Sequence, residues 1–236
     1  TKNLAKKAFG NSNVFLEKFI KNARHIEIQI FGFGEKKAVH FYERDCSIQR
    51  RFQKIIEESP APKVGSDIIN KMSESAVNFA SNQKYEGAGT IEFIYDVDEK
   101  KFYFLEMNTR IQVEHPVTES ITNSDLVEMQ IKFALGIDTN LTEQNKINRT
   151  GHAIECRLYA EDPSKNFLPS PGKISKLKIP NTNLANIRLD IGVDEGDEIS
   201  FYYDPMIAKI IAKGSTRVES IKNMLQYLKE FEIEGI

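Results

Sequence analysis

The stretch between Phe102 and Pro116 holds the residues of this chain that are best suited to chemistry. Alternate side chains of an extended strand point to opposite faces, so a period of two divides the stretch into an apolar face and a polar face. The predicted polar face consists of Glu106, Asn108, Arg110, Gln112 and Glu114. An ordinary solvated face would more often carry lysine, serine and threonine. Carboxylates, carboxamides and a guanidinium at this spacing indicate a functional site.

The preceding stretch adds a second carboxylate to this site. Residues 88–95 are rich in β-formers, and residues 96–101 are typical of a hairpin turn. If the turn is centred near Glu99, antiparallel pairing places Glu92 opposite Glu106. Opposed residues have Cβ atoms roughly 4.5–5.5 Å apart, and two carboxylates at about 4 Å repel by about 4 kcal/mol at an effective dielectric constant of about 20. A Mg²⁺ or Mn²⁺ ion held by Glu92, Glu106 and the Asn108 carbonyl would remove this repulsion. The alternative is a solvated pair.

Length and composition exclude several classes of protein. The 236 residues can form one large domain or two modest ones, and 40% hydrophobic with 28% charged residues is ordinary for a globular chain. With 32 basic and 34 acidic residues the net charge is −2, which gives no sign of a nucleic-acid surface. No apolar run approaches the ~20 residues of a membrane span, and we expect no membrane contact. Cys46 and Cys156 are predicted to be reduced thiols in a cytosol-like compartment.

The periodicities predict an α+β chain with a boundary in the polar stretch 139–149. Predicted helices cover residues 1–9, 67–83, 124–135 and 216–230. Predicted strands cover residues 14–20, 24–33, 37–45, 88–95, 102–115, 151–159, 172–179 and 206–213. The first three strands would form an antiparallel meander, and Ser66 or Asp67 would cap the helix that follows Pro62.

Two further stretches have both a structural and a functional interpretation. Residues 44–54 are dense in hydrogen-bond donors and form either a solvated loop or a site for an anionic ligand. Arg157 is predicted to share a strand face with Glu155 and Tyr159. It could form a structural salt bridge or bind a ligand.

Taken together, these motifs resemble the biotin carboxylase family of the ATP-grasp superfamily. The matching stretches occur in family order across nearly the whole chain, and the least common of them is EMNTRIQVEHP at residues 106–116. The others are EKFI at 17–20, ARHIE at 23–27, ERDCSIQRRFQ at 43–53, GAGTIEF at 87–93, ECR at 155–157, FLPSPG at 167–172 and YDPM at 203–206.

The resemblance implies a fold and a domain division. Residues 1–138 would be the C-terminal part of an ATP-grasp domain, an antiparallel sheet with flanking helices. Residues 150–236 would be the smaller, mixed α/β biotin carboxylase C-terminal domain. Both ends of the chain look cut, so we expect the N-terminal domain and the glycine-rich lid to lie upstream and the end of the second domain to be truncated. Without the lid, the fragment is expected to be inactive alone.

The resemblance also implies a ligase reaction, in which ATP activates bicarbonate as carboxyphosphate and the carboxyl group passes to N1′ of biotin. ATP and Mg²⁺ or Mn²⁺ would be required, and biotin would be carried on a separate domain or subunit. The implied partners are that carrier, a carboxyltransferase and, in the complete enzyme, a second copy forming a homodimer. The implied location is the cytoplasm, or the mitochondrial matrix in a eukaryote.

Site roles transfer by matching position. The adenine and ribose would contact Glu17, Lys18, Phe19, Ile20 and His25. The metal that bridges the ATP phosphates would bind Glu92, Glu106 and Asn108. Bicarbonate would contact Lys54, Arg110, Gln112 and Val113. Glu114 would be the base that deprotonates bicarbonate, and Arg157 would bind biotin and stabilise its enolate.

One departure from the family pattern and two alternative functions need consideration. Phe52 stands where family members often carry histidine or asparagine, and its ring cannot donate to a phosphate. A different ATP-grasp ligase, of the carbamoyl-phosphate or peptide type, would share the metal hairpin, but Arg157 and the FLPSPG stretch argue against it. A third possibility is a non-catalytic folding or dimerisation module. The sequence leaves the final carboxyl acceptor open.

Overall fold

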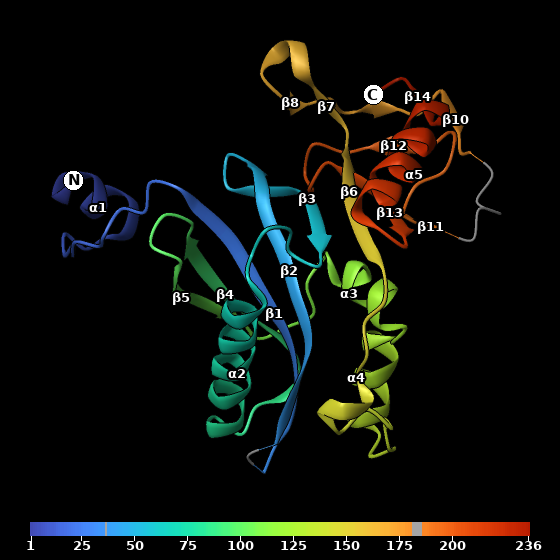
Figure 1. Cartoon of the computed structure of the whole chain (residues 1–236). Helices are drawn as coiled ribbons and strands as arrows, with labels where there is room; N and C mark the ends of the chain where they lie inside the picture. Colours follow the sequence, from blue (N-terminus) through green and yellow to red (C-terminus); the bar gives the residue numbers. More distant parts are fainter. Residues whose placement is uncertain (36, 181–185) are drawn as a thin grey trace.

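A single eight-stranded sheet runs through the whole molecule (Figure 1). The computed structural model describes residues 1–35, 37–180 and 186–236. The strand order is β11-β13-β6-β3-β2-β1-β4-β5, and every neighbouring pair is antiparallel. The strands are β1 (Ala23–Phe33), β2 (Ala38–Arg50), β3 (Gln53–Ser59), β4 (Glu86–Asp96), β5 (Lys101–Asn108), β6 (His152–Tyr159), β11 (Ile187–Ile191) and β13 (Met206–Gly214).

The remaining elements flank this sheet. Short two-stranded ladders are formed by β7 (Glu161–Asp162) with β8 (Leu168–Pro169), β9 (Gly172–Lys173) with β12 (Glu198–Ile199), and β10 (Lys176–Lys178) with β14 (Glu232–Glu234). The α-helices are α1 (Lys2–Phe9), α2 (Ser66–Asn82), α3 (His115–Thr122), α4 (Leu126–Ala134) and α5 (Arg217–Glu230). Two single 3-10 turns are η1 (Gln144–Lys146) and η2 (Pro163–Lys165).

The period-two alternation of β1 divides the core into two sides. Ile26, Ile28 and Ile30 are completely buried and pack with the apolar stripe of α2, which includes Met72 and Ala76. The intervening residues of β1 point to the opposite face. That face is polar along half of the strand and carries the site, and it becomes apolar near Phe31, where α4 covers it.

The other helices cover the second half of the sheet. Met224 and Tyr227 of α5 pack on β6 and β13, and Val117 and Ile121 of α3 contact the same two strands at Ala153 and Ile211. Helix α3 therefore lies on β6 and β13 while it also contacts β2 and β3. It connects the two halves of the chain beside the polar face.

Most predicted elements are present, and the α+β class is confirmed. The Asp125 carboxylate caps α4 by accepting from the Glu128 amide, and the Thr216 hydroxyl caps α5 by accepting from the Glu219 amide. The predicted cap of α2 is wrong, because Gly65 occupies that position and no side chain caps the helix. None of the described helices is long and apolar enough to cross a membrane.

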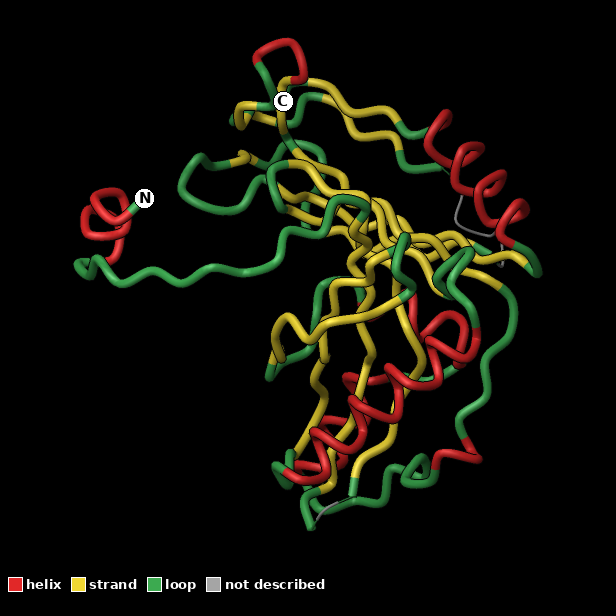
Figure 2. Tube along the Cα trace, turned by 60° about the vertical axis from the view of Figure 1, so that its left-hand side comes forward, coloured by secondary structure: helices red, strands yellow, loops and turns green. Residues whose placement is uncertain are grey.

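The predicted strand over residues 14–20 is wrong. These residues form an irregular segment that is not part of the sheet and that follows α1, which stands away from the rest of the molecule (Figure 2). Phe15, Leu16 and Phe19 are 83%, 100% and 87% exposed. Their apolar character predicts a strand, but none of the described strands pairs with them, so the meander consists of β1, β2 and β3 instead.

The predicted strand over residues 102–115 is too long. Strand β5 ends at Asn108, and its last ladder partner is Thr90 on β4. Beyond this point the chain turns away from the sheet edge and enters α3, which the sequence analysis missed. Pro116 lies in the first turn of that helix, where its missing N–H is not needed. Arg110, Gln112 and Glu114 therefore lie on a loop, and strand alternation does not orient them.

Two predictions in the second half also need correction. The strand expected over residues 172–179 is divided into β9 and β10, which pair with different partners. Residues 44–54 are not a loop, because β2 extends to Arg50 and turns directly into β3. Strand β3 pairs with β2 on one side and with β6 on the other. Strands that precede and strands that follow the polar stretch at residues 139–149 therefore belong to one continuous sheet.

Candidate active site

One row of charged residues crosses the polar face of the sheet. Arg44 on β2 pairs with Glu27 on β1, Glu27 pairs with Glu92 on β4, and Glu92 pairs with Glu106 on β5. The predicted register between Glu92 and Glu106 is therefore confirmed. Three carboxylates stand side by side in this row, and cations are needed to offset their repulsion.

Lys54 supplies a cation at the centre of the row. It extends from β3, and its Nζ donates to Glu27 Oε2 at 2.6 Å, Glu92 Oε1 at 3.2 Å and Glu114 Oε1 at 2.7 Å. Burial alone would lower the pKa of Lys54, but the surrounding carboxylates raise it, with Glu27 first among them. Lys54 is therefore charged and links the sheet to the loop that carries Glu114.

Glu92 is surrounded by donors. His25 Nε2 lies 2.5 Å from its Oε2, while Asn108 Nδ2 and Gln112 Nε2 donate to its Oε1 at 2.7 and 2.8 Å. Burial would raise the pKa of Glu92, but the His25 hydrogen bond and the Lys54 charge lower it to about 2. Glu92 is thus ionised and orders the strand residue Asn108 and the loop residue Gln112 around it.

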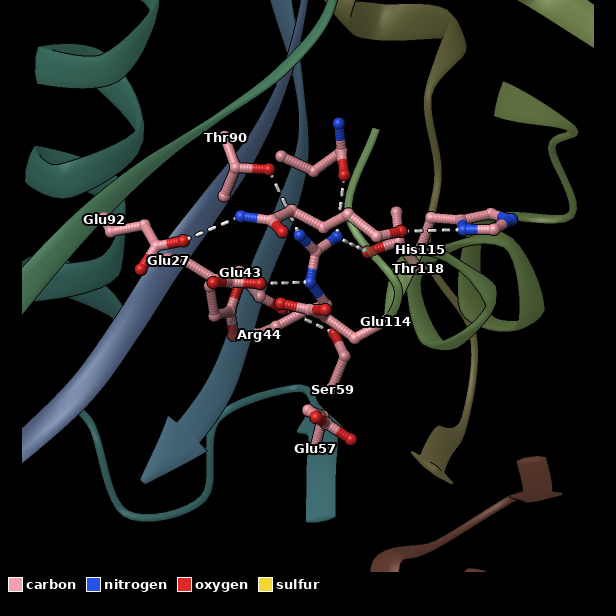
Figure 3. Close-up of polar contacts among 12 residues, drawn as sticks. Glu27, Glu43, Arg44, Glu57, Ser59, Thr90, Glu92, Glu114, His115 and Thr118 are labelled. Atoms are coloured by element: carbon pink, nitrogen blue, oxygen red, sulfur yellow. Dashed lines mark hydrogen bonds and ion pairs between the residues drawn. The ribbon is translucent and has the colours of Figure 1, made fainter. Parts of the chain in front are cut away.

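Arg44 fixes the buried end of the row (Figure 3). Its side chain is completely buried and donates to Glu27 Oε1 at 2.6 Å, Gln29 Oε1 at 2.8 Å, Thr118 Oγ1 at 2.9 Å and Thr90 Oγ1 at 3.3 Å. Burial would raise the pKa of Glu27, but the charges of Arg44 and Lys54 lower it to about 2. Arg44 has a structural role, since every one of these acceptors belongs to the core of the sheet or to α3.

Arg157 reaches the site from β6, in the second half of the chain. Its Nη2 donates to Glu114 Oε2 at 2.9 Å, and its Nε donates to Glu57 Oε1 at 2.8 Å. The side chain is 11% exposed and also lines the cleft described below. Arg157 therefore forms the structural salt bridge considered from the sequence, and it also presents a guanidinium to the cleft.

The loop between β5 and α3 supplies the remaining polar groups. Arg110 Nη1 donates to Gln112 Oε1 at 2.8 Å, and Gln112 in turn donates to Glu92. The Val113 carbonyl accepts from Lys209 Nζ at 2.8 Å. These contacts place the loop over the carboxylate row, although the order of its side chains does not follow strand alternation.

These side chains surround a single cleft of about 800 Å³. The predicted site residues that line it are Lys18, Phe19, Ile20, His25, Lys54, Glu92, Glu106, Asn108, Arg110, Gln112, Val113, Glu114 and Arg157. Glu17 is the one predicted residue outside this lining. The mouth also includes Phe52, which is 98% exposed at the tip of the β2–β3 hairpin. Contacts within the cleft lead from Glu92 at its acidic end through Lys54 and Glu114 to Arg157.

The irregular segment before β1 forms one wall of the cleft. Lys18 Nζ donates to Glu99 Oε1 at 2.5 Å in the β4–β5 turn and lies 5.8 Å from the centre of the Tyr103 ring. Phe19 and Ile20 present apolar surface to the cleft, opposite Ile94 of β4. An apolar wall next to backbone polar groups suits a planar heterocycle such as a nucleotide base.

The donor set at the acidic end fits a hard divalent cation. Glu106 is exposed to the cleft and forms no hydrogen bond or ion pair among the described residues, and the Asn108 amide donates to Glu92 through its nitrogen, leaving its oxygen available. Carboxylate and carbonyl oxygens are the ligands that Mg²⁺ and Mn²⁺ prefer. Glu92 already accepts four donors, so a metal ion would have to displace one of them.

Several residues of the site were missed from the sequence. Glu27 and Arg44 lie at the heart of the ion-pair row, and Glu57 holds Arg157. The signal for Glu27 is present, since it stands between His25 and Gln29 in a strand that carries Ile26, Ile28 and Ile30 on its other face. Nothing in the local pattern identifies Glu57, because its importance depends on which strand lies next to β3.

The comparisons with known proteins agree with this geometry. The family model for the ATP-binding domain of the carbamoyl-phosphate synthase L chain matches residues 1–142, and the model for the biotin carboxylase C-terminal domain matches residues 155–236. Biotin carboxylase 1 of Bacillus subtilis is 51% identical over 236 residues, which are 100% of this chain and 52% of that protein. The mitochondrial methylcrotonoyl-CoA carboxylase subunit alpha of Mus musculus is 47% identical over 98% of this chain and 32% of its own length.

Solved structures have the same arrangement. The biotin carboxylase domain dimer of the Hydrogenobacter thermophilus 2-oxoglutarate carboxylase, in complex with MgADP, ADP and bicarbonate, superposes with a TM-score of 0.91 and 42% identity, over 99% of this chain and 51% of that chain. The β,γ-ATP complex of biotin carboxylase from Campylobacter jejuni superposes with a TM-score of 0.90 and 44% identity, over 100% of this chain and 51% of that chain.

The antiparallel sheet, with its row of carboxylates along one cleft, defines an ATP-binding fold of the ATP-grasp class. The second family model and the relatives narrow this class further, and the chain belongs to the biotin carboxylase family. It spans about half the length of the biotin carboxylases that it matches.

Proposed function

We propose that this chain provides the ATP, bicarbonate and biotin sites for the first half-reaction of a biotin-dependent carboxylase. In this reaction ATP activates bicarbonate as carboxyphosphate, and biotin receives the carboxyl group on N1′. The observation that carries the proposal is the position of Glu114, which accepts from both Lys54 and Arg157 at the junction of the acidic and basic ends of one cleft. A base is required there, between the phosphoryl donor and the final acceptor.

The acidic end is proposed to receive the nucleotide phosphates. Glu92, Glu106 and Asn108 would hold Mg²⁺ or Mn²⁺, which would neutralise charge on the phosphates. The adenine and ribose would lie against residues 17–20 and His25, although Glu17 would have to act from outside the present lining. The complexes of related proteins with MgADP and with an ATP analogue support this assignment.

Bicarbonate is proposed to bind beside the phosphates. Arg110 can grip an anion with two parallel hydrogen bonds, and Lys54, Gln112 and the Val113 backbone complete the pocket. Phosphoryl transfer to bicarbonate depends mainly on positioning and charge neutralisation. The related domain that carries both MgADP and bicarbonate supports a shared site for the two substrates.

Glu114 is proposed to take the bicarbonate proton and, in doing so, to prepare Arg157. An ionised Glu114 accepts from Arg157 Nη2. Once Glu114 is protonated, its attraction for the guanidinium falls, while Glu57 Oε1 still lies 2.8 Å from both Nε and Nη2. The guanidinium donor released from Glu114 then becomes available to the biotin oxygen, where negative charge develops as N1′ loses its proton. One proton transfer would thus connect the two chemical steps.

The assembly around the chain is also a proposal. Residues 1–138 are assigned to the ATP-grasp domain and residues 150–236 to the C-terminal domain, in line with the two family models. Biotin would arrive on a carrier domain or subunit, and a carboxyltransferase would use the product. A homodimer of the complete enzyme is supported by the related dimeric domain, and a cytoplasmic or mitochondrial location by the bacterial and mitochondrial relatives.

ATP hydrolysis by the complete enzyme tests the proposal. Hydrolysis should require bicarbonate and should accelerate when free biotin is added, with formation of carboxybiotin. Stimulation by ammonia or by an amine in place of biotin would instead identify a carbamoyl-phosphate or peptide-type ligase. The absence of ATP binding in calorimetry would leave only a folding or dimerisation module.

A further inference from the structure

Two buried glutamates behind the cleft take no part in the chemistry proposed above as acid, base or ligand. Glu57 on β3 and Glu155 on β6 are direct partners in the ladder that joins these strands. Both residues are completely buried, and Figure 3 shows Glu57 beside the ion-pair cluster. Because opposed residues have Cβ atoms roughly 4.5–5.5 Å apart, the two carboxyl groups share one buried space.

The carboxyl oxygens of this pair lack hydrogen-bond donors. Among the described residues, Glu57 Oε2 and both oxygens of Glu155 have no partner, although all three are buried. Only Glu57 Oε1 is satisfied, by Arg157 Nε at 2.8 Å. An ionised carboxylate that is buried without a partner is so unfavourable that the group takes up a proton instead.

Nearby cations are too few to neutralise both carboxylates. Arg157 is already shared between Glu57 and Glu114. Lys209 donates to the Val113 carbonyl and lies 3.3 Å from Asp190 on β11. The titratable groups that interact with the pair from the surrounding elements are Glu27 on β1, Cys46 on β2, Glu114 before α3, Cys156, Arg157 and Tyr159 on β6, and Lys209 on β13.

The direction of the pKa shifts agrees with this geometry. Burial raises the pKa of Glu155 well above its usual value, and the neighbouring Glu57 raises it further. Burial also raises the pKa of Glu57, to about 7, because the Arg157 charge offsets only part of the effect. Glu155 therefore keeps its proton at neutral pH, while Glu57 titrates near neutrality.

We propose that Glu57 and Glu155 share one proton at pH values just above neutral, with Glu155 as the acid and Glu57 as the carboxylate, and that this pair positions Arg157 for biotin. The inference rests on the proposed function. The Glu155 O–H donates to the orphaned Glu57 Oε2, and the charge left on Glu57 holds Arg157 through Nε. Glu57 thereby keeps the guanidinium in the cleft when Glu114 becomes protonated. Neither glutamate touches a substrate, so both are positioning residues.

Kinetics of the complete enzyme with free biotin test this role. Glu57→Gln removes the charge that holds Arg157, and kcat/KM for biotin should fall roughly 10- to 100-fold, as expected for the loss of a hydrogen bond to a charged group. Biotin-independent ATP hydrolysis should change little. Glu155→Gln replaces a protonated carboxyl group with a neutral donor of the same shape and should leave both activities within about twofold.

The pH profile distinguishes positioning from a purely structural role. In the wild-type enzyme, kcat/KM for biotin should fall as the pH drops below about 7, because Glu57 loses its charge. This acid limb should be retained in Glu155→Gln and should disappear in Glu57→Gln. In Glu155→Leu no group donates to Glu57 Oε2, so the pKa of Glu57 should rise and the limb should move to higher pH.

Glu58→Gln is the matched control. Glu58 is the next residue of β3, points to the other face, and pairs with Arg217 and His152. Its substitution should lower stability without moving the biotin pH profile. Thermal unfolding of each variant checks that it folds.

Three outcomes would overturn the proposal. A shift of the acid limb to lower pH in Glu155→Gln would mean that Glu155 is charged in the wild type. Identical profiles for Glu155→Gln and Glu155→Leu would mean that no hydrogen bond joins the pair. Equal losses of ATP hydrolysis with and without biotin in Glu57→Gln would mean that Glu57 does not act through Arg157.

Infrared spectroscopy tests the shared proton without relying on the activity. The difference spectrum of wild type minus Glu155→Gln at neutral pH should contain the C=O band of a protonated carboxyl group. A carboxylate band there would refute the shared proton. If the wild type shows the C=O band but biotin does not stimulate its turnover, the proposed function is wrong and the shared proton of Glu57 and Glu155 is not.

Discussion

Two arginines line the same cleft, but their contacts give them different roles. Arg110 is exposed and bonded to Gln112, so it faces the region where phosphoryl group and bicarbonate would meet. Arg157 comes from β6 and is held between Glu57 and Glu114. Both line one cleft, but only Arg157 comes from the second half of the chain, and residues of the first half hold it there.

Separate substitutions in the complete enzyme should reveal this difference. Arg157→Ala should remove biotin carboxylation but spare much of the slow, biotin-independent ATP hydrolysis, whereas Arg110→Ala should damage both. A charge-assisted contact made mainly in the transition state is worth about 3–4 kcal/mol, or roughly 10²–10³ in rate. ATP hydrolysis with and without free biotin measures both effects. Equal losses of the two activities in Arg157→Ala would assign it to the nucleotide or bicarbonate step.

Glu92 and Glu106, which face each other on β4 and β5, also differ in their surroundings, and the sequence does not reveal this difference. From sequence, both Glu92→Gln and Glu106→Gln are expected to relieve repulsion in the metal-free hairpin. The structure corrects this expectation for Glu92, since Lys54 and three other donors already compensate its charge. Glu106 has no such compensation among the described residues, and its neutralisation alone should relieve the remaining repulsion.

A Mg²⁺ titration of the complete enzyme tests the metal assignment. Both Glu92→Gln and Glu106→Gln should raise the Mg²⁺ concentration needed for half-maximal ATP use. Urea unfolding should show that Glu92→Gln lowers the free energy of unfolding and that Glu106→Gln does not. Wild-type kinetics across the titration for either variant would remove that residue from the proposed metal site.

At the scale of the elements, the buried end of the site is built where three strands and a helix meet. Arg44 joins β1, β2, β4 and α3 through acceptors on each neighbour. Breaking such a buried pair from one side leaves an uncompensated carboxylate in the core and costs about 3–5 kcal/mol.

Arg44→Met should therefore lower the free energy of unfolding by about 3–5 kcal/mol in urea denaturation. Adding Glu27→Gln should recover part of the loss, because the orphaned charge is removed. The exposed Arg51, which donates only to the Asn166 carbonyl among the described residues, is the matched control, and Arg51→Met should change the free energy by no more than about 0.5 kcal/mol. Equal effects at the two positions would contradict the structural role of Arg44.

The elements that sequence predicts well are those whose pattern is local. The alternation of β1, the β4–β5 hairpin and the capped helix α5 depend on residues close in sequence, and they occur close to where they are expected. The segment 14–20 and the loop after Asn108 are mispredicted because both depend on whether a partner strand is present. The same limit applies to the site, since Lys54 meets Glu114 only through the pairing of β3 within the sheet.

At the scale of the molecule, two family models divide the chain, but one sheet holds it together. The β3–β6 ladder runs from Ile56 to Ser59 opposite Cys156 to Ala153. It lies between the ATP-grasp half and the C-terminal half. Separating the halves would break this ladder and expose two strand edges.

We therefore expect the two halves to unfold in one transition. Hydrogen exchange measured by mass spectrometry should give β1 and β13 the same free energy of opening, since neither can leave the sheet without the strands between them. Residues 11–20 should exchange much faster and serve as the internal control. Two separate transitions, with β13 opening at lower free energy, would show that the halves are energetically independent.

The unbroken sheet also restricts how the enzyme can move. A hinge needs a place where few contacts cross, and the β3–β6 ladder leaves no such place between Lys54 and Arg157. We therefore expect the backbone positions of these two residues to keep the same separation when a substrate binds. Any closure over the proposed ATP site would then have to come from segments outside the sheet. The length of the cleft between these two residues would then be fixed. Bending of the sheet could not adapt the cleft to a longer or shorter acid.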